Sequence, residues 1–447
     1  MRLSVCILLA ALSALALCHA ATRPRYGGTL RVEMQAAPAA LDPSAADAAP
    51  LTSSVFEPLV RLDATGAVQP WLALDWQHDA TSRRWQFHLR SGVRFQDGSE
   101  LTAAAALPSL ETALPGVPLA AAGDTVVIRA SRPMPGLLLD LAQAPIFTRD
   151  AEGHFAGTGP FRPAAFDPGR RAIFAANDDY WGGRPFVDAI EVQLGRGLRD
   201  QLVDLELGKA DVVELAPSDF RRATAHAGEV WSSAARRLVA LAFAPGREDV
   251  RLRDALALSI DRAAMHDVLL QKQGEVCASL LPEWISGYAF AFSTAPDLVR
   301  ARALAAAVPP ANRVLMLSYD PAMPAARSLA DRVAVNARDA GVIVHVTPQN
   351  ARAAVRLMEL RLPSPNPGRA LAGIAAALGL EAPRTGAGIT ALYESESRLL
   401  EGSRVIPLFY LPDLYAVASR VRVYAPPAVT RLGEWRFGNI WLSGTLP

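Results

Sequence analysis

The chain has 447 residues, of which 51% are hydrophobic and 20% are charged, and its formal net charge is +1. A chain of this size and composition can build large apolar cores and more than one lobe. The near-zero net charge excludes proteins that bind nucleic acid or an anionic membrane surface by charge alone. Of the 45 basic residues, 43 are arginine, so a single arginine is weak evidence for a binding site.

The first 20 residues predict a cleaved signal peptide. Arg2 supplies a positive charge, and an apolar run extends from Val5 to Leu17. This run is shorter than the about 20 residues that a membrane-spanning helix needs. Cys18-His19-Ala20 has the small-x-Ala pattern of a cleavage site, so we expect cleavage after Ala20 and a periplasmic protein. Lipid attachment to Cys18 is the alternative, which Leu17 disfavours because bacterial lipoproteins have a small residue there.

Strand patterns begin directly after the signal peptide. Thr29 to Glu33 alternates polar and apolar residues at period two, and Trp85, Phe87 and Leu89 repeat this alternation before a turn at Asp97-Gly98. Farther along, short strands alternate with amphipathic helices, which is typical of α/β lobes. The further predicted strands are Val126–Arg129, Ile190–Leu194, Val239–Phe243, Val314–Ser318, Ile343–Val346 and Val405–Tyr410.

Two helices are predicted from apolar residues that recur every three or four positions. The first follows Asp249 as one continuous helix, on which Asp261 and Arg262 are expected to form a local ion pair. The second runs from about Ala325 to Ala340, with Gly341 suited to end it. The apolar faces are best explained by core packing, and their residues are Leu252, Leu256, Ile260, Ala263 and Leu270 in the first helix and Leu329 and Val333 in the second.

Several segments of the chain, taken together and in this order, resemble the family 5 extracellular solute-binding proteins, the peptide and nickel receptors of ABC importers. No single segment would identify the family, but the ordered set extends from residue 26 to residue 417. The segments include YGGTLRVEMQAAPAALDP (26–43), VFEPLVRLDATGAVQPWLALDWQHD (55–79), RRWQFHLRSGVRFQDGSELT (83–102), GTGPFRPAAFDPG (157–169), NDDYWGGRPFVDAIEV (177–192), VRLRDALALSIDR (250–262) and RVIPLFYLPDLYAV (404–417).

The resemblance implies an α/β, two-lobed fold of the periplasmic binding protein type, with a small extra subdomain inserted in the first lobe. A ligand would lie between the lobes and be sealed by hinge closure. The expected divisions are a signal peptide at 1–20, a first lobe at 21–48, 155–238 and 405–447, an inserted subdomain at 49–154 and a second lobe at 239–404.

No catalytic signature was found, because Walker, GxGxxG, GxSxG and HExxH motifs are all missing from the sequence. The seven histidines are scattered singly, so we predict neither a metal site nor a cofactor, although a site assembled by folding stays open. Cys277 is the one cysteine beyond the signal peptide; we expect it to be buried and inert.

Three ligand-binding residues are expected just after the first strand, namely Glu33, Met34 and Gln35, since the ends of sheet strands face the cleft in this fold class. The alternative is that these residues only connect the strand to the loop that follows it.

In the family's peptide-binding members, a second-lobe carboxylate in an aromatic-Pro-Asp-Pro context pairs with the ligand's α-ammonium. The matching segment here has Ser364 and Asn366 where acidic residues are expected, so this anchor is lost. Glu359 is the candidate substitute, and Arg361 is suited to bind a carboxylate bidentately, as is Arg356. The segment from 368 to 393 is also short for the family, which predicts a reduced rim of the pocket.

The sequence therefore predicts an exported receptor of an ABC importer that binds a small solute, an oligopeptide being one candidate, without catalysis. It would act as a monomer with inner-membrane permease subunits and without nucleic acid. The alternative is a sensory or interaction protein that keeps the scaffold after losing the peptide pocket. A periplasmic hydrolase has no motif in its favour.

Overall fold

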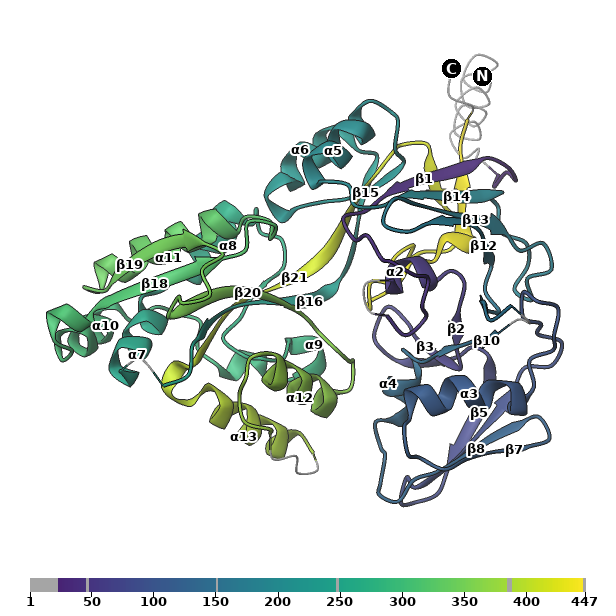
Figure 1. Ribbon diagram of the computed structural model, residues 1–447, viewed down its shortest axis with the longest axis horizontal. Helices are drawn as coiled ribbons and strands as arrows, with labels where there is room; N and C mark the ends of the chain where they lie inside the picture. Colours follow the sequence, from purple (N-terminus) through teal and green to yellow (C-terminus); the bar gives the residue numbers. More distant parts are fainter. Residues whose placement is uncertain (1–22, 46–47, 150–151, 247–248, 384–387, 445–447) are drawn as a thin grey trace, which may run out of the picture.

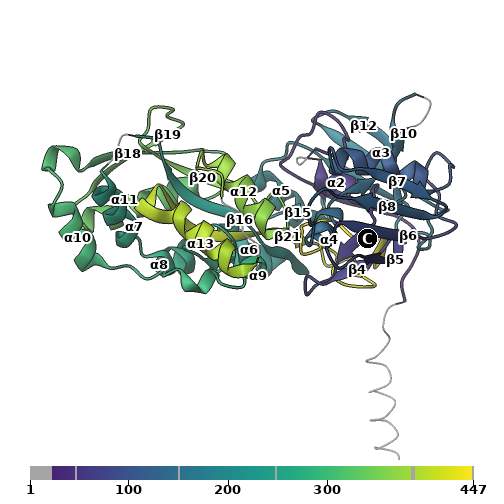
Figure 2. The ribbon, with the colours of Figure 1, turned by 90° about the horizontal axis from the view of Figure 1, so that it is seen from below.

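The computed structural model describes residues 23–45, 48–149, 152–246, 249–383 and 388–444. The predicted signal peptide, with Cys18, lies outside these residues. The chain forms two bodies that are linked by a narrow pair of strands (Figure 1), and the view from below shows the same separation (Figure 2). Among the described residues, no helix is long and apolar enough to cross a membrane.

One sheet extends through both bodies, in the order β12-β13-β14-β1-β15-β21-β16-β20-β18-β19. In the first lobe β1 (Thr29–Glu33) pairs in parallel with β14 (Ala189–Gln193) and with β15 (Val212–Glu214). The period-two alternation of β1 places Leu30 and Val32 in the core, as predicted. The outer strands of this lobe are β12 (Phe161–Asp167) and β13 (Arg171–Ala176).

The inserted region has its own sheet, ordered β5-β6-β8-β7, which confirms the predicted strands in this part of the chain. Its apolar core contains Trp85, Phe87 and Leu89. The helix α3 (Ala103–Ala113) begins where the Thr102 hydroxyl accepts the N–H of Ala105, a standard cap of a first turn. The four strands are β5 (Ala73–His78), β6 (Arg84–Leu89), β7 (Leu119–Ala122) and β8 (Thr125–Arg129).

The second lobe contains β18 (Val314–Tyr319), β19 (Ile343–Pro348) and β20 (Val355–Arg361) with helices packed against them. The predicted helix of residues 325–340 is confirmed as α11 (Ala326–Asp339). Leu329 and Val333 are fully buried, and Gly341 has a φ of +84° just after the helix.

The prediction of one continuous helix after Asp249 was wrong. The chain forms α7 (Val250–Ser259) and α8 (Arg262–Leu269), and it leaves helical geometry at Ile260, whose ψ is 115°. Asp261 begins the second helix, because its carboxylate accepts the N–H of Ala264 at 3.0 Å. The expected ion pair with Arg262 is replaced by a hydrogen bond from Arg262 Nε to the carbonyl of Pro407 at 2.9 Å.

The apolar pattern of this segment still packs almost as predicted, since Leu252, Leu256, Ile260 and Leu270 are buried in one core. Ala263 is exposed instead, because the break rotates the second helix and brings Met265 inward. A periodic pattern therefore located the core face but did not reveal the break.

Two long antiparallel strands form the connection between the lobes: β16 (Glu229–Phe243) and β21 (Val405–Val417). In Figure 1 both stretch from one body into the other. Every residue of β21 is buried. Ile406 and Phe409 belong to the core of the second lobe, whereas Tyr415 and Val417 belong to that of the first. Residues 405–411, expected in the first lobe, thus pack with the second.

Candidate functional site in the cleft between the lobes

A cavity of about 380 Å³ lies beside the connecting strands. It is built by the first lobe, by the inserted subdomain, by the end of β20 and by the loop that follows β22 (Val421–Val423). The volume is at the lower end of the range of about 300–1,000 Å³ that is typical of ligand pockets. The walls are largely apolar; they include Pro43, Pro50, Phe56, Pro58, Pro145, Leu362, Pro363 and Leu432.

A cluster of charged residues adjoins this cavity on β16, β20 and β21. Arg237 of β16 lies at the centre: its Nη1 donates to Glu359 Oε1 at 3.0 Å, and its Nε is 3.2 Å from Asp413 Oδ1. Arg361 holds both oxygens of Asp413 with two parallel contacts of 3.1 and 3.2 Å. Burial alone would lower the pKa of Arg237, but the carboxylates of Glu359 and Asp413 outweigh it and raise that pKa.

The neighbouring residue, Arg236, is in a different situation. It is only 8% exposed and lines the cavity, yet within the described residues its guanidinium has no hydrogen bond or ion pair, and its Nε is enclosed without an acceptor. Burial lowers its pKa. The ladder between β16 and β21 steps from Ala235 opposite Pro412 to Arg237 opposite Leu411, so Arg236 is the extra residue of a β-bulge. Bulges of this kind redirect side chains and are common next to functional sites.

Gly433, in the loop after β22, allows this arrangement. Its φ is +77°, and a Cβ atom there would lie 2.7 Å from Asp413 Oδ2 and 2.9 Å from Arg236 Nη1. A residue with a side chain would be strained and would also displace both charged groups. The backbone of the loop at Gly433 thus lies so close to Asp413 and Arg236 that only glycine fits there.

Substitution of Gly433 by alanine is expected to lower the free energy of unfolding by about 1–3 kcal/mol, through backbone strain and the displaced side chains. Urea unfolding followed by circular dichroism measures the change. Gly92→Ala is the matched control, because Gly92 has a φ of +76° but nothing within 4 Å of its added Cβ. Equal losses in the two variants would show that Gly433 matters only for its φ and not for its closeness to Arg236 and Asp413.

The structure places Glu33, the last residue of β1, and the next two residues, Met34 and Gln35, outside this cavity. Glu33 is buried and lies 3.5 Å from Arg196, and Met34 is part of the first-lobe core. Gln35 is exposed, and its backbone N–H donates to the carboxylate of Glu214 at 2.5 Å. Their predicted role in ligand binding stays a prediction.

The four predicted residues of the second lobe lie close to the cleft, and Arg361 is the one that lines the cavity. Glu359 is engaged by Arg237, as described above. The hydroxyl of Ser364 accepts the N–H of Asn366 at 3.0 Å. Asn366 in turn caps α12 (Pro367–Ala377), because its side-chain oxygen accepts the N–H groups of Gly368 and Arg369.

Asn366 also takes part in a contact across the cleft. Asp140, at the end of the inserted subdomain's α4 (Leu137–Leu141), accepts from Asn366 Nδ2 at 3.3 Å and pairs with Arg369 at 3.3 Å. The carboxylate of Asp140 is largely enclosed, and burial raises its pKa. The subdomain and the second lobe are therefore in direct polar contact at this edge.

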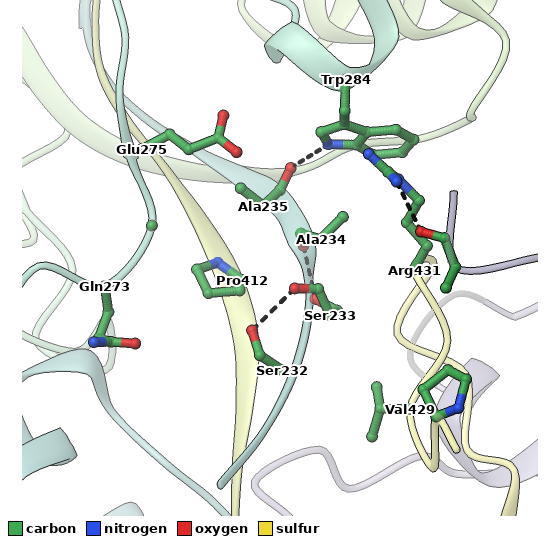
Figure 3. A pocket seen from close by; sticks show the side chains of 13 residues that line it. Ser232, Ser233, Ala234, Ala235, Gln273, Glu275, Trp284, Pro412, Val429 and Arg431 are labelled. Carbon is green, nitrogen blue, oxygen red and sulfur yellow. Dashed lines mark hydrogen bonds between the residues drawn. The ribbon is translucent and has the colours of Figure 1, made fainter. Parts of the chain in front are cut away.

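A second cavity, of about 440 Å³, lies against the same connecting strands, and Figure 3 shows its lining. Trp284 Nε1 donates to the carbonyl of Ala235 at 2.8 Å, and the guanidinium of Arg431 lies 4.9 Å from the centre of the Trp284 ring. Arg431 also donates to the carbonyl of Ala64 at 3.0 Å. The Nε of Arg431 is enclosed without an acceptor, but its guanidinium already has two partners. This cavity therefore offers an anionic ligand less than the first one does.

Cys277 is buried, as predicted, and burial raises the pKa of its thiol well above the ordinary value. In the described part of the chain, no three histidine, cysteine or acidic side chains are grouped so that they could hold a metal ion.

Two α/β bodies joined by a pair of strands, with a cavity between them, define a two-lobed solute-binding protein. Residues 67–362 match the family of bacterial extracellular solute-binding proteins, family 5 Middle, and the chain belongs to this family. The family resemblance and the fold expected from it are thereby confirmed. Membership also places the chain among binding proteins rather than enzymes.

Solved structures share the fold over most of the chain. The ABC transporter substrate-binding protein CtaP of Listeria monocytogenes superimposes with a TM-score of 0.81 at 16% identity, covering 94% of this chain and 100% of that chain. The oligopeptide-binding protein AppA of Bacillus subtilis, solved with a nonapeptide, has a TM-score of 0.78 at 15% identity, covering 94% and 100%.

In sequence, the nickel-binding periplasmic protein of Escherichia coli is 26% identical over 264 residues, which are 51% of this chain and 50% of that protein. The chain thus spans about half the length of this relative in the alignment.

Sequence reasoning missed Arg236. A signal was present, because Arg236 and Arg237 place two adjacent charges directly before the apolar run from Leu238 to Phe243. The abundance of arginine in the chain concealed it, and nothing in the sequence distinguishes the paired arginine from the unpaired one.

Proposed function

We propose that this protein is the exported solute-binding component of an ABC importer, which holds a small solute in the cavity beside the connecting strands and presents it to permease subunits as a monomer. The observation that supports this most is the composition of the cavity wall, to which both lobes contribute. Pro43 and Phe56 come from the N-terminal side of the chain, whereas Leu362 and Pro363 follow β20 of the second lobe.

A ligand that touches both lobes favours the arrangement in which they are close together. It shifts the population by the difference between its free energies of binding to the open and closed forms. The Asp140 contacts with Asn366 and Arg369 would stabilise the closed form from the opposite edge of the cleft. The periplasm is the location that this function requires, and periplasmic relatives support it.

A peptide bound through its α-ammonium is not the ligand that we favour. Glu359, the substitute for the family's acidic anchor, already faces Arg237 at 3.0 Å, and Ser364 and Asn366 are engaged in local hydrogen bonds. The same observation supports the second candidate function, a sensory or interaction protein that keeps the scaffold without a peptide pocket.

Thermal unfolding of the purified chain against a library of small peptides, sugars, amines, organic acids and divalent metals tests the proposal. A ligand at 100 times its dissociation constant adds about 2.7 kcal/mol to the stability of the native state. We expect a shift that is confined to one chemical class, together with a smaller radius of gyration in solution scattering. If no compound shifts the transition, the importer proposal fails and the interaction protein is favoured.

A further inference from the structure

The charged cluster on β16, β20 and β21 contains three arginines but only two carboxylates that pair with them. Arg237 and Arg361 are paired with the carboxylates of Glu359 and Asp413. Arg236 is the third arginine. In the described part of the chain its guanidinium forms no hydrogen bond or ion pair, and its Nε is enclosed without an acceptor. A buried charge that is not paired destabilises the empty protein. Arg236 at the cavity wall is therefore better explained by a ligand that pairs with it than by a contribution to folding.

Two acidic groups face Arg236 from neighbouring elements, but neither forms an ion pair with it. Asp413 is held by Arg237 and Arg361. Glu434, in the loop after β22, accepts a hydrogen bond from the Thr430 hydroxyl at 3.1 Å, and burial raises the pKa of Glu434. The charge of Arg236 is therefore available to a ligand.

The remainder of the cavity wall defines the rest of the ligand. Apart from Arg236, Arg361 and Glu434, its polar side chains are neutral, and the apolar lining residues are prolines, alanines, leucines and Phe56. Such a wall suits an apolar body and offers little to a sugar or a metal ion. The neutral polar residues of the wall are Ser44, Thr52, Ser53 and Gln143.

We propose that the solute bound in the cleft is an organic anion with an apolar body, whose carboxylate pairs with Arg236. This inference rests on the proposed function of the same cavity. A guanidinium matches a carboxylate with two parallel hydrogen bonds, and such charge-assisted bonds are strong where water is excluded. Through this pair the ligand would supply the negative charge that the empty cleft lacks, directly on a strand that connects the lobes.

The test compares carboxylic acids with their neutral amides by thermal unfolding and calorimetry of the full chain. The probes are benzoate and benzamide, hexanoate and hexanamide, and trialanine with a free or an amidated C-terminus. For at least one pair we expect the acid to stabilise the protein and the amide to have no effect. Arg236→Met should weaken binding of that acid at least tenfold, and Arg236→Lys should restore part of it.

Two readouts distinguish ligand binding from a structural role of Arg236. The melting temperature of the empty Arg236→Met protein should equal or exceed that of the wild type, because the substitution removes an unpaired buried charge. Arg132→Met, which replaces an exposed arginine of the inserted subdomain, is the control and should change neither binding nor stability. A fall in the melting temperature of empty Arg236→Met comparable to that of Arg237→Met would overturn the inference.

The outcome also separates this inference from the proposed function. If a neutral or cationic compound of the library binds the wild type and Arg236→Met equally well, the importer function stands and the anionic ligand is overturned. If no compound of any class stabilises the wild type, both fall. If the acid binds the wild type and Arg132→Met but not Arg236→Met, the result supports both the importer function and the anionic ligand.

Discussion

Replacement of Arg237 by methionine is expected to lower the free energy of unfolding by about 3–5 kcal/mol. Arg237 is buried between Glu359 at 3.0 Å and Asp413 at 3.2 Å, and it also donates to the carbonyl of Pro412 at 2.7 Å. Its removal would leave two carboxylates with a missing partner close to the centre of the connecting strands. Urea unfolding at pH 7, followed by circular dichroism and tryptophan fluorescence, measures the loss.

The adjacent position provides the sharpest control for this result. Arg236→Met makes the same chemical change one residue earlier on the same strand, but it breaks no ion pair, so it should not destabilise the protein. If the two variants lose equal stability, the distinction between a paired and an unpaired arginine is wrong. A loss below about 1 kcal/mol in Arg237→Met would show that the cluster is worth no more than a surface ion pair.

The second large effect is expected in the first lobe, at Asp211. Its side chain is fully buried (0% exposed) and accepts hydrogen bonds from two guanidinium groups: Arg31 at 3.0 and 2.8 Å, and Arg420 at 2.7 Å through each of two nitrogens. These bonds tie β1 and the turn after β21 to the start of β15. Asp211→Asn is expected to cost about 3 kcal/mol, at the low end for a broken buried pair because solvent reaches both arginines.

The pH dependence of stability gives an independent check on Asp211. Burial would raise its pKa, but the hydrogen bonds from Arg31 and Arg420 outweigh burial and hold that pKa below the ordinary value. For such a group the stabilisation is fully present above the unfolded-state pKa of about 3.9 and is lost as the pH falls through the lower folded-state pKa. The wild type should therefore lose stability more steeply than Asp211→Asn below about pH 4. Parallel curves of melting temperature from pH 7 to pH 2.5 would contradict this assignment.

Much of the fold could be predicted from local patterns. The alternation of apolar residues in β1 and β6, and the helical spacing in α11, each reflect one buried face, and a buried face is visible in sequence. The break between α7 and α8 was not visible. The apolar spacing continues across Ile260. The hydrogen bond by which the Asp261 side chain caps α8 ends the first helix, and the spacing of apolar residues carries no information about such a bond.

The site was less predictable than the fold, because it depends on pairings between distant parts of the chain. Glu359 looked like a free carboxylate in its own segment, but its partner Arg237 is 122 residues away in sequence. Ser364 and Asn366 were selected from the position of an expected acid. Their side-chain oxygens instead accept hydrogen bonds at the start of a helix, and Asn366 Nδ2 donates to Asp140 of the inserted subdomain. Arg236 could be separated from Arg237 only by the register of β16 against β21.

The continuity of β16 and β21 through both lobes also determines how this protein can be dissected. A fragment that contained either lobe alone would end in the middle of two paired strands and would expose the backbone hydrogen-bonding groups of a sheet interior as new edges. Such fragments would aggregate or pair with other chains. The inserted subdomain has a separate sheet, and its apolar core includes Leu432 but no residue of the two strands that connect the lobes. It is therefore the part that could be excised or exchanged between relatives without cutting those strands.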